Sequence, residues 1–201
     1  MKPKLLSACA VLALLSPIAA QAGQLGEWIG DAPVNTLPAA SGGTCHPEAG
    51  FSPEGSAARL VDRAIDRAQH SIRLAAYSFT STDVVRRLIE AKRRGVDVAV
   101  IVDEKNNLVE DRSGRGRAAL NLLVNAGIPT RTISIFKNFH EKFFVADGQN
   151  VETGSFNFSA AAATKNSENV LVLWNCPLMA KPYLEHWQSR WPQAVDFRTT
   201  D

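Results

Sequence analysis

The segment 140–157, HEKFFVADGQNVETGSFN, constrains the fold of this chain more than any other. Its middle, Asp147-Gly148, favours a two-residue hairpin turn, and apolar residues flank that turn on both sides. On a β-strand, residues two apart share a face, so His140 and Lys142 are expected to project together. The sequence therefore predicts a β-hairpin that carries an imidazole and an ammonium group on one face.

The second strand of this hairpin adds neutral polar groups to the same face. If Ala146 pairs with Gln149 across the turn, His140 lies directly opposite Ser155, and Asn157 shares the face of Ser155. Directly opposed residues have Cβ atoms about 4.5–5.5 Å apart. Counting along both strands gives the next opposed pair, Lys142 and Thr153.

These residue types suit a tetrahedral anionic substrate. An imidazole has a pKa of about 6.5, so His140 can act as a nucleophile or as a general acid or base near neutral pH. Lys142 supplies a positive charge, and Ser155 and Asn157 supply neutral donors. Together they fit the negative charge that develops on a phosphoryl group in its transition state.

Two other interpretations of the cluster are weaker. A metal site is disfavoured because Lys142 would repel a divalent cation, and no second histidine or cysteine lies at ligand spacing. A purely structural interpretation makes His140 a half-buried strand residue and extends Lys142 to solvent. The presence of all the polar positions in order favours chemistry.

The spacing H-x-K-x4-D followed by G-S-x-N resembles the signature of the phospholipase D superfamily, also called the HKD superfamily. A trailing N-x-E element is similar as well. The residues that carry the resemblance are His140, Lys142, Asp147, Gly154, Ser155, Asn157, Asn166 and Glu168.

From Phe51 to about Asp196, the chain is similar to the short bacterial periplasmic endonucleases of that superfamily. The resemblance implies an α/β fold, with a mixed sheet sandwiched between helices, in a single catalytic domain over 51–201. It also implies hydrolysis of DNA or RNA phosphodiester bonds without a metal or any other cofactor.

The resemblance assigns a role to each site residue. His140 would attack phosphorus and form a phosphohistidine, while Lys142 and Asn157 would hold the phosphate oxygens. Ser155 and Glu168 would support the site. The remaining motif positions would be structural: Asp147, Gly154 and Asn166.

Double displacement at phosphorus needs a second histidine as the acid, and this chain has one HKD run. Its other histidines, His46, His70 and His186, are not followed by a lysine two residues later. A two-fold homodimer would supply an identical motif across its axis. The resembling nucleases are dimers of this kind, so we expect a homodimer with one composite active site.

The N-terminus has the parts of a secretory signal over 1–22. Lys2 and Lys4 precede an apolar run over 5–15, and cleavage is expected after Ala22. The apolar run is too short for a stable membrane span, so we expect a secreted, periplasmic protein without a membrane anchor.

Charge does not identify the substrate. The whole chain has 22 basic and 20 acidic side chains, and removal of Lys2 and Lys4 leaves a neutral mature protein. Only local clusters of basic residues could then favour nucleic acid. The segment 105–117 is the most interesting, because it follows a strand end and is rich in Asn, Gly and Arg. It is also a few residues longer than the resemblance leads one to expect, which would alter access to the site.

Cys45 and Cys176 remain after removal of the signal, which contains Cys9. Two cysteines in an exported protein predict one disulfide, with two free thiols as the alternative.

Helices and strands are predicted to alternate after an irregular extension over 23–50. Helices are expected over 57–68, 82–94, 117–126 and 179–191. Strands are expected over 72–79, 96–102 and 170–174, in addition to the hairpin at 142–154. This order favours a mixed sheet covered by helices.

Two other functions remain open. The first is a phospholipase D or cardiolipin-type lipid phosphodiesterase, because phenylalanines crowd the hairpin and could form an apolar rim, although core packing explains them more simply. These are Phe136, Phe139, Phe143 and Phe144. The second is a nucleic-acid-binding or structural dimer without activity, which an intact motif disfavours.

Overall fold

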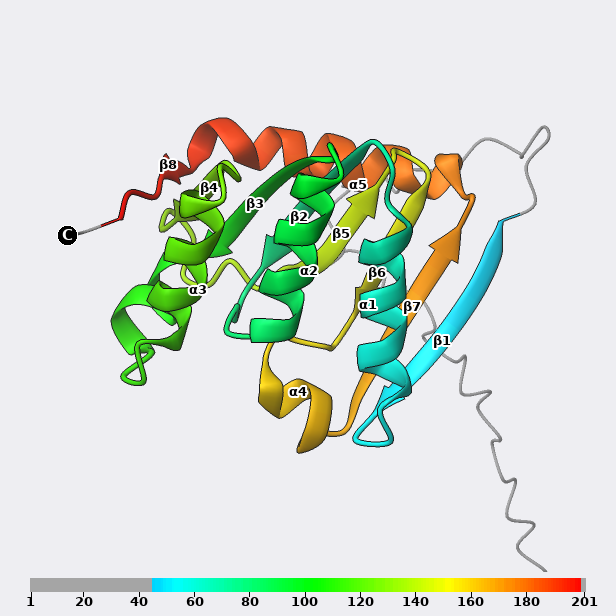
Figure 1. Ribbon diagram of the computed structural model, residues 1–201, viewed down its shortest axis with the longest axis horizontal. Helices are drawn as coiled ribbons and strands as arrows, with labels where there is room; N and C mark the ends of the chain where they lie inside the picture. The colour runs from blue at the N-terminus through cyan, green and yellow to red at the C-terminus, as the bar shows by residue number, and fades with distance from the viewer. Residues whose placement is uncertain (1–44, 200–201) are drawn as a thin grey trace, which may run out of the picture. The chain divides into compact units, whose positions relative to one another are not determined.

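The computed structural model describes residues 45–199, which form an eight-stranded sheet with helices on both faces (Figure 1). The predicted signal over 1–22 and most of the extension lie outside the described residues. The strand order is β1-β7-β6-β5-β2-β3-β4-β8. β2, β3 and β4 are parallel, and every other neighbouring pair is antiparallel. The predicted α/β fold with a mixed sheet is confirmed.

The strands are β1 (His46–Ser52), β2 (Ser71–Ala76), β3 (Asp97–Asp103), β4 (Thr130–Ile133), β5 (Lys142–Ala146), β6 (Asn150–Gly154), β7 (Glu168–Trp174) and β8 (Val195–Asp196). The helices are α1 (Ser56–Arg67), α2 (Thr82–Arg93), α3 (Arg115–Asn125), α4 (Ala160–Thr164) and α5 (Pro177–Arg190). Two further segments are the π-helix η1 (Lys105–Glu110) and the 3-10 helix η2 (Trp191–Gln193).

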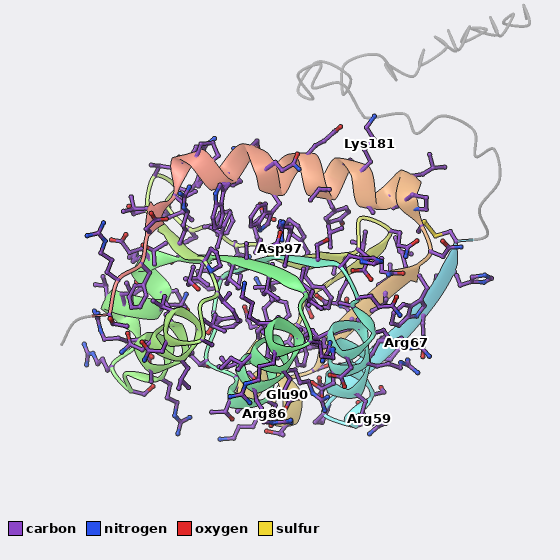
Figure 2. All side chains as sticks on the ribbon, turned by 45° about the horizontal axis from the view of Figure 1, so that its top comes forward. Arg59, Arg67, Arg86, Glu90, Asp97 and Lys181 are labelled. Atoms are coloured by element: carbon purple, nitrogen blue, oxygen red, sulfur yellow. A yellow bond between two sulfur atoms is a disulfide. The ribbon has the colours of Figure 1, made fainter. Side chains whose placement is uncertain are left out.

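Two apolar clusters hold the layers together. One lies under α1, α2 and α3, and the other lies under α5, whose Trp187 is buried and donates its indole N–H to the Leu74 carbonyl at 2.9 Å. In Figure 2, Lys181 projects from α5 on one side, while Arg59 and Arg86 project from α1 and α2 on the other. Strand residues alternate between the two clusters because successive strand side chains point to opposite faces of a sheet.

The predicted extension over 23–50 is wrong at its end. Residues 46–50 are not irregular but form most of β1, which pairs with β7 from His46 opposite Trp174 to Ser52 opposite Glu168. Gly50 lies so close to α1 that a Cβ there would be 2.7 Å from the Ser56 carbonyl oxygen. The composition of the segment hid a strand because its Pro, Gly and Ala residues have low strand propensity, and pairing with β7 overrides that propensity.

The predicted disulfide joins Cys45 to Cys176. It connects the start of β1 to the residue that precedes α5. The disulfide thereby ties the edge strand β1 to the start of α5, across a separation of 131 residues in the sequence.

Glu152 is a buried acid in the middle of β6. Its neighbours across the sheet are Phe144 and Val172, and neither carboxylate oxygen has a hydrogen-bond partner within residues 45–199. Burial in this apolar layer raises the pKa of Glu152 well above its ordinary value. The carboxyl group is therefore neutral in the folded protein at pH values where a solvated glutamate is charged.

Replacement of Glu152 by glutamine should make stability less dependent on pH. The unfolded chain releases the Glu152 proton above about pH 4.3, but the folded protein retains it, so the free energy of unfolding falls as pH rises. We expect the stability of Glu152→Gln relative to wild type to increase between pH 5 and pH 8 in urea unfolding. Glu54→Gln, a matched change at an exposed position, is the control. An equal difference at both pH values would show that Glu152 does not titrate on unfolding.

Candidate active site

The motif residues gather at one edge of the sheet. Lys142 begins β5 opposite Ala76, the last residue of β2, and Gly154 ends β6 opposite Val170. Glu168 begins the adjacent β7. This is also the carboxyl edge of the parallel strands, where ligands bind in open α/β sheets.

His140 and Lys142 are in direct contact at this edge. His140 is exposed in the segment before β5, and the Lys142 Nζ lies 3.2 Å from each of its ring nitrogens and 3.3 Å from its carbonyl oxygen. The Tyr77 ring packs against the imidazole with 4.5 Å between centroids, and the Lys142 ammonium lies 5.2 Å from the same ring centroid. The aromatic ring thus supports both motif side chains.

Two opposing effects act on the pKa of Lys142. Partial burial lowers the pKa of Lys142, whereas the negative charges of Glu168 and Glu141 raise it. The net direction is downward. A partly desolvated ammonium interacts more strongly with a phosphate than a fully hydrated one, because the effective dielectric constant is lower.

The second half of the motif forms a hydrogen-bonded chain. The Ser155 hydroxyl donates to Glu168 at 2.6 Å, and the Asn166 amide donates to the other Glu168 oxygen at 2.8 Å. The Asn169 backbone N–H donates to the Ser155 hydroxyl at 3.1 Å. The buried side-chain oxygen of Asn157 accepts no hydrogen bond from residues 45–199, so its amide group is not committed to the fold.

The hairpin turn is present, but its predicted register is wrong. Ala146 pairs with Asn150 instead of Gln149, so three residues make the turn and Phe143 lies opposite Thr153. His140 precedes the strand and has no partner across the hairpin. The additional turn residue shifts the pairing by one position, and the polar groups meet at the strand ends instead of along one face.

Asp147 and Gly154 are both explained by packing. The Asp147 carboxylate accepts backbone N–H groups from Gln69, His70 and Ser71, at the end of β5 opposite to Lys142. At Gly154 a Cβ would lie 2.2 Å from the Asn169 carbonyl oxygen, so only glycine allows this approach.

The sequence patterns did not predict that Asp103 and Asn107 hold the backbone next to His140 and Tyr77. Buried Asp103 accepts the Phe139 N–H at 2.7 Å, directly before the histidine, and the Asn106 N–H at 2.6 Å. Buried Asn107 donates to the carbonyls of Tyr77 at 2.6 Å and Asp103 at 2.7 Å. The signal available in the sequence was an acid that ends a run of apolar residues in β3.

The phenylalanines of the hairpin belong to the core. Phe139, Phe143 and Phe144 are buried, and Phe136 alone among the four is exposed, at 37%. Core packing is therefore confirmed for three of them.

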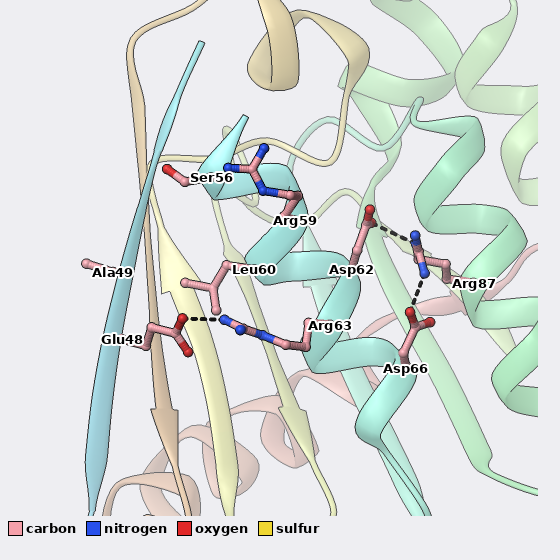
Figure 3. Close-up of a pocket in the computed structure, with 9 residues that line it drawn as sticks. All are labelled: Glu48, Ala49, Ser56, Arg59, Leu60, Asp62, Arg63, Asp66 and Arg87. Atoms are coloured by element: carbon pink, nitrogen blue, oxygen red, sulfur yellow. Dashed lines mark hydrogen bonds and ion pairs between the residues drawn. The ribbon is translucent and has the colours of Figure 1, made fainter. Parts of the chain in front are cut away.

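A hollow of about 520 Å³ between β1, α1 and α2 lies away from the motif (Figure 3). Most of its charged groups are paired: Arg63 with Glu48, and Arg87 with both Asp62 and Asp66. These ion pairs connect α1 to β1 and to α2, so the charges there serve the packing of the helices.

Residues 45–199 show neither a metal-binding cluster nor a helix suited to a membrane. In this part of the chain, no group of three or more His, Cys, Asp or Glu side chains is placed to hold a metal ion. None of the helices in the same range has the length and apolar character needed to cross a membrane.

The mixed sheet and the spaced H-x-K and G-S-x-N residues define a phospholipase D-like protein. Residues 61–191 match the family described as "Cardiolipin synthase, PLD-like domain". A solved structure of Nuc from Salmonella typhimurium, a phospholipase D family member, is 51% identical with a TM-score of 0.74, and covers 78% of this chain and 100% of that one.

Several relatives of this chain are named after phospholipid substrates. A phospholipase D of Rickettsia felis is 34% identical over 140 residues, which cover 70% of this chain and 66% of the relative. A mitochondrial cardiolipin hydrolase of Xenopus tropicalis is 30% identical over 135 residues, 65% of this chain and 61% of the relative. The match thus spans less than two thirds of the length of each relative. The chain belongs to the phospholipase D superfamily, a superfamily of phosphodiesterases.

The pKa of Lys142 predicts the basic limb of the pH–rate profile. If the ammonium form is needed, activity on a chromogenic phosphodiester should decrease as the pH rises. Because the pKa of Lys142 is lowered, this decrease should begin at a pH below the ordinary lysine pKa of about 10.4. Glu141→Gln removes a charge that raises this pKa, so the limb should move to lower pH. Glu185→Gln, on the exposed side of α5, is the control and should leave the limb in place. A limb that moves upward in Glu141→Gln would contradict the assignment.

Proposed function

We propose that this protein is a metal-independent endonuclease that cleaves phosphodiester bonds in nucleic acids, DNA or RNA. The observation that carries the proposal is the contact of Lys142 with His140 at the sheet edge where Ser155 and Glu168 also lie. The 51% identity to Nuc supports a function in the nuclease branch of the superfamily.

In the first step, an unprotonated ring nitrogen of His140 attacks phosphorus. The nitrogen–phosphorus bond forms as the bond to the leaving oxygen breaks. His140 of a second copy of the chain gives its proton to that oxygen, which leaves as an alcohol. The ammonium of Lys142 and the amide of Asn157 stabilise the phosphoryl oxygens as charge accumulates on them.

In the second step, water replaces the enzyme on phosphorus. The second histidine, now neutral, accepts a proton from the water as its oxygen attacks. The nitrogen–phosphorus bond of the phosphohistidine breaks, and His140 is released unprotonated. Ser155 and Asn166 keep Glu168 in place through both steps, so that its charge continues to act on Lys142.

This mechanism needs two histidines on opposite sides of phosphorus, which is why we propose a homodimer. The exposed position of His140 at the sheet edge supports the proposal, because a second copy can approach it there. A two-fold axis beside the site would place the two imidazoles across one phosphate.

Export to the periplasm is part of the proposal. The sequence pattern of residues 1–22 supports a cleaved signal, and the Cys45–Cys176 disulfide suits an oxidising compartment. The alternative function, a lipid phosphodiesterase, is favoured by the names of the phospholipase D and cardiolipin hydrolase relatives.

Purified mature protein should cleave plasmid DNA in the presence of EDTA, whereas His140→Ala should leave the plasmid intact. We expect a loss of at least about 10³-fold, because the variant lacks both the nucleophile and the acid of the dimer. His70→Ala, which removes an exposed histidine outside the motif, is the control. Intact plasmid and RNA with wild type, together with release of head groups from phosphatidylcholine, would establish the lipid function instead.

Mixed dimers test the composite site. Wild-type and His140→Ala subunits, carrying different affinity tags, should form heterodimers with strongly reduced activity, since one histidine is missing from the shared site. Wild-type subunits with the two tags give the reference activity. Heterodimers that retain full activity would show that each subunit works alone.

A further inference from the structure

A polar pocket of about 310 Å³ opens directly beside the candidate active site. Its wall includes Ser78, next to the Tyr77 whose ring packs against His140. It also includes Ser159, whose N–H donates to the Asn157 carbonyl at 2.7 Å. The pocket wall therefore starts one residue along the chain from Tyr77 and two residues from Asn157, both of which belong to the candidate site.

The segment 105–117 forms the outer wall of this pocket. Asn106 from η1 and Arg115 from the start of α3 both line it. The segment is held in shape by Asp111, whose carboxylate accepts N–H groups from Ser113 and Gly116. The wall is therefore an ordered part of the fold and can present fixed hydrogen-bonding groups.

Several polar side chains in the pocket have no partner among the described residues. The side chains of Ser78, Thr80, Asn106 and Arg115 make no hydrogen bond or ion pair with any other residue in the range 45–199. The acids are already engaged, since Glu110 pairs with Lys105 at 3.0 Å and Asp111 holds the loop. Within residues 45–199, the pocket thus offers donors and acceptors without hydrogen-bond partners beside the guanidinium of Arg115.

We propose that this pocket is a nucleoside subsite, which binds the sugar and base next to the scissile phosphate. The inference rests on the proposed nuclease function and names the part of the chain that recognises the substrate. Its volume lies at the lower end of the range of about 300–1,000 Å³ for small-ligand pockets, and suits one such unit.

The chemistry of the wall favours a nucleoside over an acyl chain. A base edge carries donors and acceptors together, which the Asn106 amide and the hydroxyls match, and a guanidinium such as that of Arg115 stacks on bases or binds them through its donors. The apolar side chains that line the pocket are only those of Ala160 and Ala161. An acyl chain would leave the free polar groups buried without partners.

The test compares Asn106→Ala and Arg115→Ala on two substrates. One is a short oligonucleotide, and the other is bis(p-nitrophenyl) phosphate, which has a phosphodiester but no nucleoside. Each variant should lower kcat/KM on the oligonucleotide by about 3–30-fold, the worth of one lost hydrogen bond or stacked contact, and by less than about twofold on the small ester. Arg112→Ala, an exposed arginine in the same segment but outside the pocket, should change neither.

The outcomes separate this inference from the proposed function. If wild type cleaves the oligonucleotide but both variants match it, the subsite is wrong and the nuclease stands. Equal losses on both substrates also overturn the subsite, because the residues would then act on the reacting groups or on the fold. If wild type hydrolyses phosphatidylcholine vesicles and no oligonucleotide, the nuclease function fails and the subsite fails with it.

Discussion

The close approach of Gly154 to the backbone of Asn169 is the contact on which the candidate site depends. Because a Cβ at Gly154 would lie 2.2 Å from the Asn169 carbonyl oxygen, the end of β6 can reach β7 only with glycine at this position. The next residue, Ser155, then meets both the Asn169 N–H and the Glu168 carboxylate. A bulkier residue would separate the two strands and break the hydrogen bonds of Ser155 with Glu168 and Asn169.

Lys142 is the central charged residue of the candidate site. Its ammonium contacts His140, and the negative charges of Glu168 and Glu141 oppose the cost of its partial burial. Elsewhere charges serve packing, as in the ion pairs of Arg87 with Asp62 and Asp66 between α1 and α2. The two cations differ in their partners. Arg87 forms ion pairs with two carboxylates, whereas the Lys142 ammonium contacts the exposed imidazole of His140.

The segment 103–107, which joins β3 to η1, links the candidate active site to the proposed nucleoside subsite. Its buried Asp103 and Asn107 hold the backbone before His140 and at Tyr77, while Asn106 between them lines the neighbouring pocket. Three residues of this short segment thus have two different roles. Asn106 therefore offers a position at which the pocket wall can change while Asp103 and Asn107 keep their hydrogen bonds.

The residue types of the site, the four longer α-helices and a mixed sheet could be predicted from the sequence, because they follow from local spacing and periodicity, whereas β4, β8 and α4 were not predicted. The sequence could not determine the hairpin register, where Ala146 pairs with Asn150, since a turn of two or three residues satisfies the same local pattern. Nor could it show that residues 46–50 form a strand or that Tyr77 and Asp103 support His140. Those features arise from contacts between segments far apart in the chain, and only the packing of the whole sheet sets their geometry.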